Sequence, residues 1–99
     1  MLPLVIRSRT ADGVDVVALA DLTLEVHRVE PGAEHVPTAD VVRVAEETVE
    51  SAVAQVEVCS LVEDLTELEA RWPAEVGRRL PAGTEVAALA VTQVEARLA

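Results

Sequence analysis

This chain of 99 residues contains no phenylalanine and no tyrosine, and Trp72 is its single aromatic residue. Any core must therefore be aliphatic, and a hydrophobic content of 51% supplies enough side chains to build one. Cys59 is the only cysteine, which excludes an internal disulfide and fits a reducing compartment.

Long apolar stretches are also missing. No run approaches the roughly 18 residues that a membrane-spanning helix needs. The apolar start of the chain is too short for a signal peptide and follows no basic region. We therefore expect no direct membrane span and a cytoplasmic location, at most peripheral to a membrane.

Positive charge is scarce. The chain has no lysine, and its eight arginines face 18 acidic residues, which gives a net charge of −10. Nucleic-acid binding needs clustered cations, and the only adjacent basic pair is Arg78-Arg79. We expect no nucleic-acid partner and no direct electrostatic docking on an anionic membrane surface.

Three segments have strand character, and the middle one has the clearest alternation of a strand with one buried face. Residues 2–9 precede Asp12-Gly13, a turn signal that predicts a hairpin. Residues 14–29 are apolar at every even position from 14 to 26, and Val17 and Leu19 are the exceptions on the polar side. Residues 84–98 place their even-numbered apolar residues on the predicted core side.

Two further segments have helical spacing of apolar residues. The first begins at a cap, Thr38 or Asp40, and has a stripe from Val41 to Val56. Glu46, Glu47 and Glu50 form an acidic face on its wet side, which we expect to be solvated.

The second helical stripe extends from Leu61 to Leu80 and includes Trp72 as a core residue. Ser60 to Glu63 matches a capping box at its start. Pro73 predicts a kink near Trp72 or two helices meeting there. The order β-β-α-α-β predicts one α+β domain over residues 1–99, with an antiparallel-rich sheet packed on two helices.

Four motifs occur in a fixed order along the chain. Residues 12–16 read Asp-Gly-Val-Asp-Val, and the long strand that follows ends in His-Arg-Val-Glu-Pro at 27–31. Three further motifs follow, at Thr48 to Val53, Leu61 to Glu67, and Gly83 to Val86. Together, over roughly residues 5–98, they resemble the band 7 (SPFH) domain that stomatins, prohibitins and flotillins share. His27 departs from the family pattern, which has an aromatic residue there, and Glu50 stands at the position of an arginine.

The resemblance implies a non-enzymatic scaffold that self-associates into large assemblies near a membrane. It also implies a membrane protein or a membrane protease as client. We expect a truncated or minimal member, because the membrane anchor and the coiled coil that are usual in the family are missing from this sequence.

No catalytic constellation is visible. His27, His35 and Cys59 are the only candidates for a nucleophile with its base or for soft metal ligands, and they fall on different predicted elements. We therefore expect no enzymatic activity, no cofactor and no metal site, with exposed histidines and a packed, inert thiol.

Two hypotheses for partner binding remain. In the first, the chain forms a homodimer or higher oligomer through apolar residues on the polar side of its strands, namely Val17, Leu19, Leu89 and Val91. In the second, it is a stand-alone acidic adaptor or regulatory domain, and the face of Glu46, Glu47 and Glu50 binds a basic protein.

Overall fold

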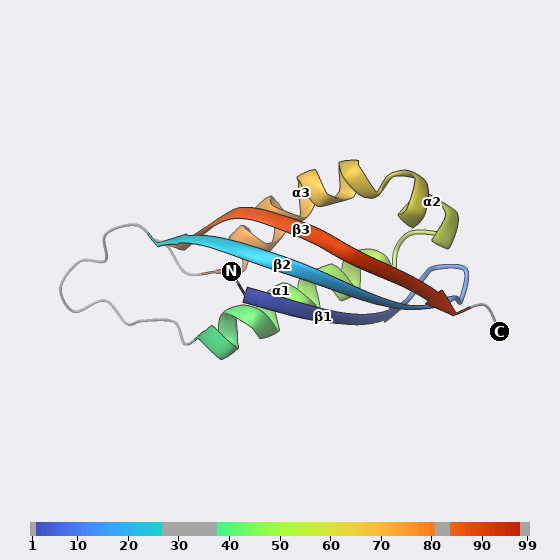
Figure 1. The fold of residues 1–99 in the computed structure, drawn as a ribbon, viewed down its shortest axis with the longest axis horizontal. Coiled ribbons are helices and arrows are strands. Elements are labelled where there is room, and N and C mark those ends of the chain that lie inside the picture. The colour runs from blue at the N-terminus through green and yellow to red at the C-terminus, as the bar shows by residue number, and fades with distance from the viewer. Residues whose placement is uncertain (1, 27–37, 81–83, 98–99) are drawn as a thin grey trace.

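The computed structural model describes residues 2–26, 38–80 and 84–97. The elements in chain order are β1 (Leu2–Arg9), β2 (Asp15–Val26), α1 (Thr38–Val53), α2 (Val58–Glu63), α3 (Leu65–Arg78) and β3 (Thr84–Arg97). The strands form one sheet, and the helices pack against one of its faces (Figure 1). The predicted α+β class is confirmed, and the second predicted helix is divided into two.

The long strand β2 lies at the centre of the antiparallel sheet, between β1 and β3. Leu22 of β2 pairs with Leu2 of β1 and with Leu89 of β3. The predicted pairing of the last strand with the long strand is thus confirmed. Residues 27–29 and 98, which the sequence also assigned to strands, lie outside the described residues.

The hairpin between β1 and β2 follows the Asp-Gly prediction. Gly13 has a φ of 86°, a conformation that side chains with a Cβ rarely adopt. Its N–H donates to the carbonyl of Thr10 at 3.0 Å. The buried Thr10 hydroxyl donates to the Asp12 carboxylate and accepts the Val14 N–H, so its polar atom is satisfied inside the turn.

This turn is also tied to the helical layer. The N–H of Ala11 donates to the carbonyl of Val56 at 2.8 Å. The N–H of Val58, the first residue of α2, donates to the Asp12 carboxylate at 3.0 Å. The two bonds fix the end of the hairpin against the connection between α1 and α2.

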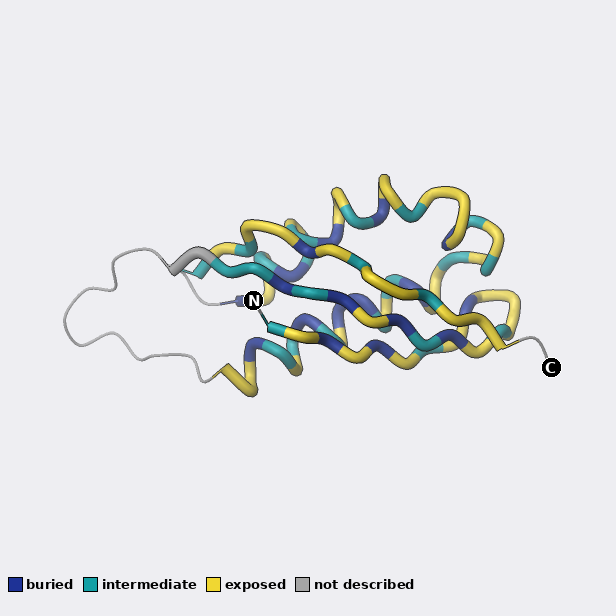
Figure 2. The backbone as a smooth tube through the Cα atoms, in the orientation of Figure 1, coloured by how far each residue is buried: buried dark blue, intermediate teal, exposed yellow. Residues whose placement is uncertain are grey.

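The core lies between the sheet and the helices, and buried positions alternate along β1 and β2 (Figure 2). As predicted, it is aliphatic except for Trp72, which is 3% exposed. The even-numbered residues of β2 from 16 to 22 are all buried. They belong to the same core as the predicted stripe of α1, of which Val41, Ala45, Val49 and Val53 are buried. Burial of each such Leu or Val stabilises the fold by roughly 1.5–3 kcal/mol.

The sequence predicts a kink near Trp72 or two helices that meet there, and the meeting of two helices at Trp72 is wrong. α3 continues through Pro73, and the second stripe instead breaks at Asp64, between α2 and α3. A proline inside a helix removes one hydrogen bond. Trp72 and Val76 are buried on either side of Pro73, and this packing holds the helix together across it.

The predicted helix caps are also wrong. α1 begins at Thr38, which places Thr38 and Asp40 in its first turn. Glu57 precedes α2 without a capping hydrogen bond from its side chain, and Ser60 lies inside the helix. The hydrogen bond that Asp12 accepts from Val58 takes over part of the capping role at α2, from a segment far away in the sequence.

Candidate protein-interaction surface

The face of the sheet opposite the helices is called the outer face here. Its centre is apolar: Val5 is 44% exposed and Leu19 39% exposed, and the two residues are cross-strand partners. Val17, two residues before Leu19 on β2, is half-buried on the same face. These three side chains form an apolar patch that no described helix covers.

Of the four predicted interface residues, the structure places two on the outer face. Val17 and Leu19 lie there as predicted. The placement of Leu89 and Val91 on that face is wrong. Leu89 is 4% exposed and belongs to the core, and Val91 is partly buried against the same core.

Two β-bulges in β3 explain the error. The register of β3 against β2 shifts between Leu19 and Ala20 and again between Thr23 and Leu24, so that Thr92 and Ala87 have no partner. A bulge adds one residue to one strand and reverses which residues face the core. The core-facing apolar residues of β3 are therefore Val86, Leu89, Val91 and Val94.

A cluster of charged residues lies at one end of the outer face, beside the apolar patch. The Arg9 guanidinium donates to Asp15 across the hairpin at 2.9 Å. This hydrogen bond, and then the negative charge of Asp15, raise the pKa of Arg9. The pair is exposed, so its contribution to stability is small. Arg97 of β3 lies opposite Asp15 in the register and extends the cluster of charges.

Two glutamates of the predicted acidic face on α1 accept hydrogen bonds from the backbone of β1. The Glu46 carboxylate accepts the N–H of Val5 at 2.8 Å, and Glu50 accepts that of Arg7 at 3.4 Å. Both glutamates are half-buried, which corrects the expectation of a solvated face for them. Glu47 is exposed and pairs with Arg43 at 3.5 Å.

The other chemical candidates do not come together. His27 and His35 lie outside the described residues. Cys59 is exposed on α2, so the expectation of a packed thiol is wrong. Within residues 2–26, 38–80 and 84–97, no group of three His, Cys, Asp or Glu side chains converges as a metal site requires.

A groove between α1 and α3 was not foreseen from the sequence. It has a volume of about 610 Å³. Arg71, Arg78 and Arg79 line it, and Leu68 and Trp72 contribute its apolar part. The sequence signal was the spacing of the arginines, which recur after seven and eight residues and so share one side of a helix.

Comparison with known proteins adds no assignment, since neither the family models nor the curated proteins contain a match to this chain. None of the helices in the described parts of the chain has the length and apolar character to cross a membrane. The band 7 resemblance therefore remains a prediction from the motifs.

Proposed function

We propose that this chain is a non-enzymatic self-association module of band 7 type that binds a second copy through its outer face. In its full context it would act on the cytoplasmic side of a membrane, as the resemblance implies, with a membrane protein or protease as client. The observation that carries the proposal is the exposure of Val5 and Leu19 as cross-strand partners on an uncovered sheet face.

The apolar patch is suited to close contact because its residues are neighbours in the sheet. Directly opposite side chains on adjacent strands lie close enough to form one continuous surface. Val17 extends that surface along β2. A second sheet packed face to face would remove these side chains from water, as happens between the two layers of a β-sandwich.

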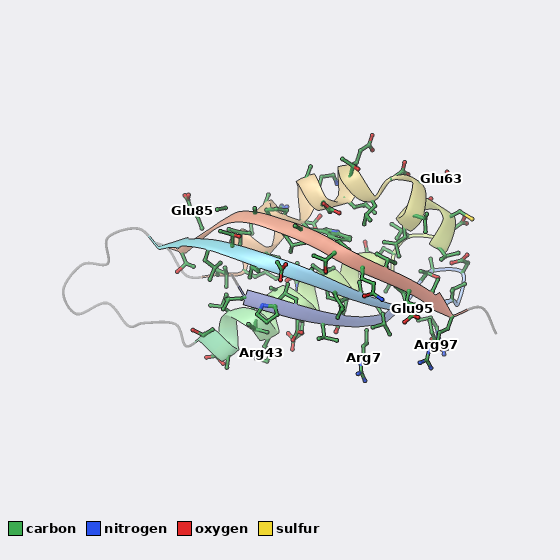
Figure 3. All side chains as sticks on the ribbon, viewed as in Figure 1. Arg7, Arg43, Glu63, Glu85, Glu95 and Arg97 are labelled. Atoms are coloured by element: carbon green, nitrogen blue, oxygen red, sulfur yellow. The ribbon has the colours of Figure 1, made fainter. Side chains whose placement is uncertain are left out.

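The charges of the outer face support a two-fold arrangement. Arg7, Glu95 and Arg97 lie toward the end of the sheet where β1 ends, and Glu85 lies at the opposite end (Figure 3). Asp21 adds a second carboxylate toward that opposite end, where β1 begins and Pro3 is its cross-strand partner. The first end has three arginines, Arg7, Arg9 and Arg97, against two carboxylates, Asp15 and Glu95. In a symmetric dimer with antiparallel sheets, this more basic end of each copy meets the acidic end of the other.

Replacement of Leu19 by glutamate tests the proposal. We expect the unmodified chain to sediment as a dimer at a low concentration at which Leu19→Glu is a monomer. An unpaired carboxylate in a dry contact costs about 3 kcal/mol, which weakens association by about 100-fold. Because Leu19 is exposed, the thermal unfolding of the variant, followed by circular dichroism at a concentration where both proteins are monomeric, should stay close to that of the unmodified chain.

The matched control is Ala39→Glu, which adds the same charge at an exposed position in the first turn of α1. It should leave the dimer intact and so exclude a general effect of added negative charge. An unmodified chain that stays monomeric at high concentration would overturn the proposal, and so would a Leu19→Glu chain that dimerises as well as the control.

A further inference from the structure

The groove between α1 and α3 carries positive charge on a strongly acidic molecule. Arg71, Arg78 and Arg79 line it together with one acidic residue, Glu75. Among the described residues, none of the three arginines lies within ion-pair distance of a carboxylate. The Arg78 Nε–H donates to the carbonyl of Ala74 at 3.3 Å, which leaves its terminal nitrogens available.

The groove also has an apolar floor. Leu68 and Trp72, which line it, are 8% and 3% exposed, and Ala52 and Val56 contribute from the side of α1. A tryptophan at the base of a pocket and arginines at its edge are the residue types that dominate binding energy in protein interfaces. A fitting occupant therefore has an apolar side chain flanked by carboxylates.

The chain carries such an element at α2. Val62 is 63% exposed, more than the other exposed large apolar residues among the described ones. Glu63 and Asp64 follow it directly, and both are exposed. Between residues 54 and 70 the chain has five acidic residues and no basic one, and none of these carboxylates pairs with a cation of the described residues.

We propose that the exposed acidic element of one copy, Val62 to Asp64, docks in the α1–α3 groove of a second copy. Val62 enters above Trp72, and the carboxylates of Glu63 and Asp64 pair with Arg71 and Arg79. Arginine is suited to this role because its planar guanidinium binds a carboxylate through two hydrogen bonds.

This contact joins two different surfaces and is therefore head-to-tail. Each copy that uses its groove still presents its acidic element, so the contact propagates into rings or filaments. It deepens the proposed self-association by naming a second contact between copies, and it uses no residue of the outer face. The two contacts can therefore fail independently.

Charge reversal separates the two halves of the contact. In a Leu19→Glu background, which removes the outer-face contact, one variant carries Arg71→Glu and Arg79→Glu, and the other carries Glu63→Arg and Asp64→Arg. The first has an intact acidic element, and the second has an intact groove. All proteins are kept reduced, because Cys59 is exposed on α2.

We expect neither variant to associate with itself in sedimentation velocity experiments. Their mixture should form mixed assemblies, because each variant's groove then meets an element of opposite charge on the other variant, and this association should be at least about tenfold tighter than either self-association and weakened by added salt. A chain that carries all four reversals should assemble again, because both surfaces are then exchanged. These substitutions are on exposed side chains, and circular dichroism confirms that each variant is folded.

A mixture that stays monomeric, with both variants folded, would overturn the head-to-tail contact whatever Leu19→Glu shows. Mixed assemblies that form equally well when Val62 is replaced by glutamate in both variants would also contradict the docking of Val62. Failure of the outer-face proposal has a different signature, since it leaves the unmodified chain and Leu19→Glu with the same assembly state.

Discussion

The carboxylate of Glu46 on α1 accepts the backbone N–H of Val5 on β1 at 2.8 Å. Glu50, one turn further along α1, accepts the N–H of Arg7, and the hydroxyl of Ser8 donates to the Glu50 carbonyl at 2.8 Å. β1 is an edge strand, and an edge strand with unpaired N–H groups is a template for pairing with other chains. The helix therefore closes this edge of the sheet with two carboxylates.

Removal of the Glu46 carboxylate should weaken the edge. We expect Glu46→Ala to lower the free energy of unfolding by about 1 kcal/mol, the usual net value of one hydrogen bond. The amide of Val5 should also exchange its hydrogen faster in native-state exchange measured by NMR.

Glu47→Ala is the matched control, since Glu47 is on the same helix but pairs only with the exposed Arg43. Its effect on the free energy of unfolding should stay within about 0.5 kcal/mol. Equal losses in the two variants, with no change in Val5 exchange, would show that the hydrogen bond to β1 contributes nothing.

The two bulges of β3 lead to a second prediction. Leu89 is 4% exposed and lies in the core, whereas Leu19 is 39% exposed on the outer face. Leu89→Ala should therefore lower the free energy of unfolding by about 2–4 kcal/mol, because it leaves a cavity between β3 and the helices. Leu19→Ala should lower it by less than about 1 kcal/mol.

Urea unfolding followed by circular dichroism measures both changes. Both proteins are measured at a concentration where they are monomeric, so that the outer-face contact does not contribute to stability. A larger loss for Leu19→Ala than for Leu89→Ala would mean that the sequence pattern, rather than the bulged register, describes β3.

These residues also show how far the sequence can predict this fold. The alternation of β2 places Val16 to Leu22 correctly, because a strand without bulges keeps its period of two. The same rule fails in β3, because the unpaired residues Ala87 and Thr92 reverse the facing and have no distinctive residue type.

Only part of the candidate surfaces could likewise be predicted from the sequence. Val17 and Leu19 were predicted for the outer face, since they interrupt an otherwise polar series. The role of Glu46 at the edge of β1 was not predictable, because it depends on how a helix lies beside a strand 41 residues away. The α1–α3 groove was missed for the same reason, as it exists only after two helices have packed.

Asp12 makes stability depend on pH. The hydrogen bond from the Thr10 hydroxyl, with further help from the N–H of Val58, lowers the pKa of the Asp12 carboxyl below its ordinary value of 3.8. A carboxyl whose pKa is lower in the folded state stabilises the fold above the ordinary pKa. That contribution is lost as the pH falls through the lowered value.

The variant Asp12→Asn should therefore be less stable than the unmodified chain at neutral pH, and the difference should shrink below about pH 4. Urea unfolding at a series of pH values measures it. Asp21→Asn is the control for removing one negative charge from an acidic chain. A difference between Asp12→Asn and the unmodified chain that stays constant from neutral to strongly acidic pH would contradict this account.

Replacement by alanine should change the free energy of unfolding in opposite directions at two glycines. Gly13 has a φ of 86°, so Gly13→Ala strains the hairpin turn and should lower the free energy of unfolding by about 1–2 kcal/mol. Gly77 lies inside α3, and an added Cβ there would meet no other atom within 4 Å. Gly77→Ala should therefore raise the free energy by about 1 kcal/mol, because alanine is the better helix former. For a domain of this size, each 1 kcal/mol shifts Tm by about 4–8 °C in calorimetry. The two shifts should be opposite in sign, and a fall of Tm in Gly77→Ala would show that α3 does not continue past Pro73.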